Sequence, residues 1–84
     1  MQIVMHLDEV MRERKYSVRA LAKATGISEV NLTRIKNGRL KGIRFSSLKA
    51  LCEVLECTPG DLIGCMSDEQ FENEFGYLPE EEEG

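Results

Sequence analysis

The stretch of sequence that decides the fold is residues 17–38, SVRALAKATGISEVNLTRIKNG. Ser17 and Ser28 are of a type that caps helix N-termini, because a hydroxyl oxygen accepts a hydrogen bond from an otherwise unpaired backbone N–H. Gly26 suits the left-handed conformation that commonly ends a helix. Asn37-Gly38 is a second stop and turn signal. The stretch therefore predicts two short helices joined by a tight turn.

The two predicted helices span residues 17–25 and 28–37. Ala22 is small enough to let them cross closely, and Leu32 and Ile35 fall three residues apart on the inner side of the second helix. Two short helices joined by a turn that contains glycine form the helix-turn-helix arrangement. The opposite side of the second helix is then left for solvent or for a ligand.

Three further helices are expected around this motif. One spans about residues 6–15, a fourth is capped by Ser46 or Ser47, and Thr58 caps a short fifth helix. The run Ile3-Val4-Met5 is either an edge strand or the lead-in to the first helix. The apolar residues of these helices recur at helical spacing: Leu7, Val10 and Met11, then Leu48, Leu51, Cys52 and Leu55, then Leu62 and Ile63.

The resulting prediction is an all-α fold, a compact five-helix domain over residues 1–64 with its motif at 17–38. Residues 65–84 form an acidic C-terminal extension. Within it, a capping pattern from Ser67 predicts a short helix that carries Phe71 and Phe75. The like-charged run Glu80–Glu83 is expected to be disordered.

Charge is strongly segregated along the 84 residues, although the net charge is only −4. All eleven Lys and Arg lie between Arg12 and Lys49, together with only two acids, whereas residues 50–84 hold eleven acids and no base. Such asymmetry favours one surface that meets phosphate and one that does not.

Other classes of protein find little support in the sequence. No apolar run approaches the roughly 18 residues that span a membrane, and no signal peptide is evident, so a cytoplasmic protein is expected. With one histidine, His6, and no nucleophile motif or phosphate-binding glycine loop, we expect no enzyme, no cofactor and no small-molecule substrate. Cys52, Cys57 and Cys65 lack the spacing of a zinc finger, so no metal is expected.

Residues 17–28, followed by Leu32–Gly38, resemble the Cro and lambda-repressor-like family of bacterial and phage regulators, and the likeness extends over about residues 5–64. The resemblance implies a helix-turn-helix domain that binds operator DNA and regulates transcription, commonly as a dimer. The chain departs from the family at Val18, where the family often has a glutamine that contacts DNA.

The resemblance also assigns roles to residues. The outward positions of the second motif helix would read bases in the major groove: Glu29, Val30, Asn31, Thr33 and Arg34. Other polar residues are candidates for phosphate contacts, which position the protein without reading sequence: Arg19, Lys23, Ser28, Lys36, Asn37, Arg39, Lys41 and Arg44.

We expect double-stranded DNA, with a palindromic operator, as the main partner. A homodimer matches that symmetry. Apolar residues of the acidic half are candidates for the dimer contact: Leu62, Ile63, Met66, Phe71 and Phe75. The run 3–5 could instead pair as a strand across the two-fold axis, and the extension could fold back on its own domain or compete with DNA. The favoured function is a repressor of its own or a neighbouring operon, and the alternative is an antitoxin-like or adaptor module that binds another protein.

Overall fold

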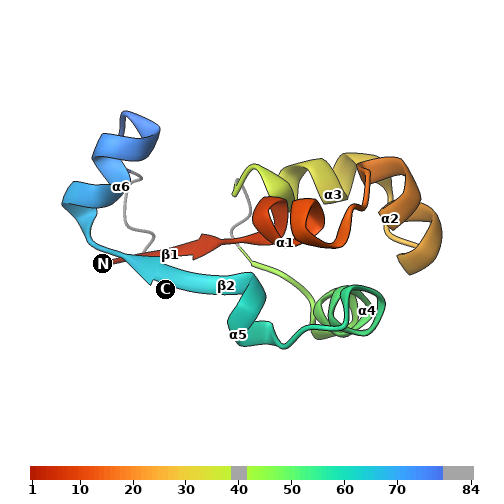
Figure 1. The fold of residues 1–84 in the computed structure, drawn as a ribbon. Coiled ribbons are helices and arrows are strands. Elements are labelled where there is room, and N and C mark those ends of the chain that lie inside the picture. The colour runs from red at the N-terminus through yellow and green to blue at the C-terminus, as the bar shows by residue number, and fades with distance from the viewer. Residues whose placement is uncertain (39–41, 79–84) are drawn as a thin grey trace.

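The computed structural model describes residues 1–38 and 42–78. Its elements follow in the order β1 (Gln2–Met5), α1 (Leu7–Arg14), α2 (Val18–Thr25), α3 (Glu29–Lys36), α4 (Phe45–Leu55), α5 (Pro59–Leu62), β2 (Ile63–Met66) and α6 (Asp68–Phe75). Helices α1–α4 gather at one end of the molecule and α6 lies at the other, with the two strands between them (Figure 1). Arg39, Lys41 and the run 80–83 lie outside the described residues.

The predicted helix ends of the motif are confirmed. Ser17 and Ser28 each accept, through Oγ, a 3.1 Å hydrogen bond from the backbone N–H three residues later. Gly26 has φ +78° and its N–H donates to the Ala22 carbonyl at 2.9 Å, which ends α2 in the left-handed conformation. Because each end is satisfied locally, α2 and α3 begin and end within one residue of the predicted positions.

The predicted start of α4 is wrong. The helix begins at Phe45, its N-cap is Arg44 in an extended conformation, and no side chain caps it. Ser46 and Ser47 therefore lie inside the first turn. At the other end of α4, Arg14 Nε donates to the Leu55 carbonyl at 2.9 Å and ties α1 to α4.

The start signal of the short α5 is confirmed. The Asp61 carboxylate accepts hydrogen bonds from the Thr58 backbone N–H at 2.9 Å and from Thr58 Oγ1 at 3.1 Å. Both bonds favour the ionised form, so they hold the pKa of Asp61 below its ordinary value. Pro59 follows the cap, where its missing N–H costs no hydrogen bond.

The run 3–5 belongs to a strand, and its partner lies in the same chain. β1 pairs antiparallel with β2, in a register that sets Gln2 opposite Met66 and Met5 opposite Ile63. The ladder brings Gly64 against the His6 ring so closely that a Cβ there would collide with it. Any larger residue at position 64 would therefore require the His6 ring to move.

One core holds the helices together. It consists of nine buried side chains: Leu7, Val10, Met11, Leu21, Leu32, Ile35, Leu51, Leu55 and Leu62. Leu62 is 0% exposed, and this burial corrects the prediction that Leu62 contacts a second subunit. Val4 and Phe71 are buried outside this cluster. The predicted all-α fold is confirmed, and the short helix predicted from Ser67 is present as α6, with Ser67 Oγ accepting a 3.1 Å hydrogen bond from the Gln70 N–H. A minor two-stranded sheet is added.

Within the described ranges 1–38 and 42–78, no helix is long and apolar enough to cross a membrane.

Candidate nucleic-acid interface

Helix α3 has one buried and one exposed face. Leu32 is 0% exposed and Ile35 is 3% exposed, so both anchor the helix to the core. The five positions that are predicted to read bases all lie at the surface: Glu29, Val30, Asn31, Thr33 and Arg34. The structure thus presents the five residues together on the side of α3 that faces away from the core.

Most of the polar groups on this face are available to a ligand. Thr33 Oγ1 donates to the Glu29 carbonyl at 2.9 Å, so its hydroxyl proton is already used. Within the part of the chain that the structure describes, the side chains of Glu29, Asn31 and Arg34 form no hydrogen bond or ion pair. Carboxylate, amide and guanidinium are the groups that pair with base edges in a major groove.

The candidate phosphate contacts differ in exposure. Arg19, Lys23, Ser28, Asn37 and Arg44 are exposed, whereas Lys36 is half-buried. Lys36 Nζ lies 3.7 Å from Asp8 Oδ1, and Asp8 also accepts a 2.8 Å bond from Arg12. Lys36 would therefore have to leave an ion pair to reach a phosphate.

Phe45 is a surface residue that the sequence interpretation missed. Its side chain is 87% exposed at the first position of α4, directly after Arg44. An apolar residue near the start of a helix is usually expected in the core, so Phe45 was not expected to be exposed. The only feature of the sequence that hints at a surface position is the cation that precedes it, Arg44.

The remaining candidates for a dimer contact differ in how much of each side chain is exposed. Ile63 and Met66 are half-buried on β2, and Phe75 is 49% exposed at the end of α6. Phe71 is only 9% exposed, because it packs inward against Phe75 and Tyr77. Little of the Phe71 surface is left for a second subunit.

The cysteines are free thiols, with Cys52 and Cys57 half-buried and Cys65 exposed. Burial, with the neighbouring Cys52 thiol, raises the pKa of Cys57, which disfavours the reactive thiolate. In residues 1–38 and 42–78, no three His, Cys, Asp or Glu side chains are grouped so that they could hold a metal ion.

The architecture and the sequence match known proteins. Residues 6–68 match the family model of the Cro/C1-type HTH DNA-binding domain. Over all 84 residues the chain is 40% identical to YozG of Bacillus subtilis (strain 168), an uncharacterized HTH-type transcriptional regulator, and the match covers 95% of that protein. A crystal structure from Bacteroides fragilis, of a protein to which DNA binding is ascribed, superposes with a TM-score of 0.67. It is 24% identical, and the match covers 75% of this chain and all of that one.

Proposed function

This chain belongs to the family of Cro/C1-type helix-turn-helix DNA-binding domains, and from the exposed face of α3 we propose that it regulates transcription by reading a specific duplex sequence. DNA-binding transcription regulation is the function that the family and the YozG relative share with it. The observation that carries the specific proposal is that α3 keeps Leu32 and Ile35 in the core and Arg34 at the surface. Such a helix fits a major groove.

The proposed contacts follow from the chemistry of that face. Arg34 donates two hydrogen bonds to guanine, Asn31 pairs with adenine, and Glu29 accepts from a cytosine amino group. Val30, which is 64% exposed, contacts a thymine methyl group. Arg19, Lys23 and the N-terminus of α3 at Ser28 would hold the flanking phosphates; those three residues are exposed, as is Arg44.

We further propose that two copies bind a palindromic operator. In the described residues β2 pairs with β1 on one edge only, so its other edge could pair with the same strand of a second copy. Two-fold symmetric pairing of the whole strand would set Ile63 of one copy opposite Met66 of the other. On this proposal the protein acts in the cytoplasm as a repressor of its own or a neighbouring operon, and no catalytic step is involved.

Selection from random duplexes tests the proposal directly. Purified full-length chain is mixed with random double-stranded DNA, and the bound fraction is sequenced over several rounds. We expect a two-fold symmetric consensus with half-sites about 34 Å apart, one helical turn of DNA. Enrichment of no sequence would contradict sequence-specific reading, and an asymmetric consensus would contradict the dimer while leaving α3 as the reading helix.

The variant Arg34→Ala tests the recognition helix. We expect it to relax the preference at one base position by about 1–3 kcal/mol while leaving non-specific binding largely intact. The matched control is Arg19→Ala, which removes an exposed arginine of α2 and should weaken all sequences alike. Both are measured by competition between the consensus and single-base variants. Unchanged selectivity in Arg34→Ala would show that another element reads the bases.

A further inference from the structure

Exposed apolar side chains are concentrated at one end of the molecule. Seven large hydrophobic residues of the described chain are exposed, and five of them lie in β1 or just before it, or at the end of α6 or just after it: Met1, Ile3, Phe75, Tyr77 and Leu78. The other two are Val30 and Phe45. Monomeric soluble proteins seldom leave apolar residues contiguous at the surface unless a partner covers them.

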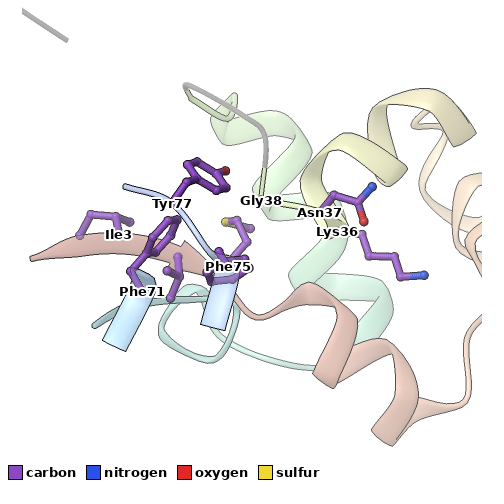
Figure 2. A pocket seen from close by; sticks show the side chains of 9 residues that line it. Ile3, Lys36, Asn37, Gly38, Phe71, Phe75 and Tyr77 are labelled. Atoms are coloured by element: carbon purple, nitrogen blue, oxygen red, sulfur yellow. The ribbon is translucent and has the colours of Figure 1, made fainter. Parts of the chain in front are cut away.

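Three of these residues, Ile3, Phe75 and Tyr77, line a groove of about 490 Å³. One wall is aromatic: the Phe71 and Phe75 rings lie 4.5 Å apart between centroids, and Tyr77 meets Phe71 edge-on at 5.7 Å. Asn37 and Gly38, at the end of α3, line the opposite side (Figure 2). Because Phe71 is itself buried, the exposed rings are held in place and lose little freedom when a partner binds.

The helix that carries Phe71 and Phe75 is acidic. Glu69, Glu72 and Glu74 of α6 are exposed and form no ion pair with any other described residue. In the sequence, no base occurs after Lys49 and four glutamates follow at 80–83. Among the described residues that line the groove, Lys36 carries the one positive charge, and its Nζ lies 3.7 Å from Asp8. The occupant that fits is therefore apolar and positively charged.

A second copy of the chain fits this groove poorly. A two-fold contact through α6 would bring two acidic helices together, at a cost in like-charge repulsion. A head-to-tail contact would place the basic part of one copy in the groove of the next, which occupies the DNA-binding side and leaves the assembly open-ended.

We propose that the groove between β1, α6 and the end of α3 binds an amphipathic segment of another protein, with apolar residues on one face and lysines or arginines beside them. An amphipathic helix laid in an apolar groove is a common mode of peptide recognition. The occupant would contact Asn37 and Gly38, next to the helix that reads DNA, so the groove is a place where a partner could meet a DNA-bound regulator. This goes beyond the proposed function, and it holds whether or not an operator is found.

The experiment uses a fluorescent peptide of about 15 residues, long enough to form a helix on binding. Leucines at helical spacing form one face and lysines the other. Two control peptides keep its length: in one the same residues are scrambled round the helix, and in the other glutamate replaces every lysine. Full-length chain is titrated into each peptide and fluorescence anisotropy is measured. We expect saturable binding of the first peptide and binding weaker by about tenfold or more for both controls.

Matched variants locate the site. Phe75→Ser keeps every charge, and we expect it to weaken binding of the peptide by about thirtyfold, as for an aromatic hot spot. Phe45→Ser removes an equally apolar and more exposed ring outside the groove, and we expect no change. Glu72→Lys should weaken binding of the lysine peptide and strengthen binding of the glutamate peptide. Retained DNA affinity in Phe75→Ser shows that the variant is folded, and it separates this test from the test of the proposed function.

Three results would overturn the proposal. One is equal affinity for the lysine peptide and the scrambled peptide. Another is an equal loss of affinity in Phe45→Ser and Phe75→Ser. The third is a dimer in sedimentation velocity that Phe75→Ser converts to a monomer, because the groove would then belong to a second copy.

Discussion

The affinity of the chain for duplex DNA is expected to fall about a thousandfold when monovalent salt rises from about 50 to 200 mM. Six of the eight candidate phosphate contacts are cations: Arg19, Lys23, Lys36, Arg39, Lys41 and Arg44. Each neutralised phosphate releases close to one counterion, so six contacts give a slope of about −5 in log affinity against log salt. A fourfold rise in salt then costs about three powers of ten for each bound subunit.

The measurement is a series of DNA titrations over that salt range, at fixed pH, with a duplex that lacks the operator and with one that contains it. Arg19→Ala should make the slope less steep by about one unit, whereas Phe45→Ser should leave it unchanged. A slope shallower than about −2 would contradict the proposal that several cations contact the DNA backbone. Binding of a protein segment in the aromatic groove should depend less on salt, because it rests mainly on apolar contact.

The helix-turn-helix motif was predictable because its determinants are local. Ser17, Gly26 and Ser28 each satisfy a backbone group within three or four residues along the chain. The exposed face of α3 follows from the same logic, because burial of Leu32 and Ile35 by helical spacing leaves Arg34 on the outside.

The sheet was not predictable in the same way. Gln2 pairs with Met66, more than sixty residues away, and a four-residue apolar run such as 63–66 looks like the end of a helix when its partner is unknown. Long-range packing also explains why the prediction of a dimer contact at Leu62 was wrong. An apolar residue in an acidic segment suggests a contact surface, yet α5 turns that side chain into the common core, where it is 0% exposed.

The prediction of where α4 starts was wrong for a local reason. Ser46 and Ser47 are good N-cap residues by type, but the chain becomes helical one residue before them, at Phe45. The exposure of the Phe45 ring could not be predicted either, because the spacing of apolar residues predicts only which of them are buried. The groove beside α6 could not be predicted from the sequence, because β1, α6 and the end of α3, which form it, are distant from one another along the chain.

Leu32→Ala is expected to remove about 2–5 kcal/mol from the free energy of unfolding, as for other leucines cut back in a packed core. Leu32 is 0% exposed and lies in the cluster that joins α1, α2, α3, α4 and α5. A domain of this size has little stability to spare, since small domains lie near the lower end of roughly 5–15 kcal/mol. The thermal midpoint should fall by roughly 10 °C or more.

The matched control is Arg34→Ala, two positions along the same helix and on its exposed side. It should change the free energy of unfolding by no more than about 0.5 kcal/mol, because an exposed side chain without a bond to the described chain contributes little. Urea unfolding followed by circular dichroism compares the two variants. The expected outcome is a separation of effects: Leu32→Ala loses stability, and Arg34→Ala loses base preference with stability intact. A loss below about 1 kcal/mol in Leu32→Ala would mean that α3 is not anchored through that side chain, and the exposed face opposite it would lose its support as a reading surface.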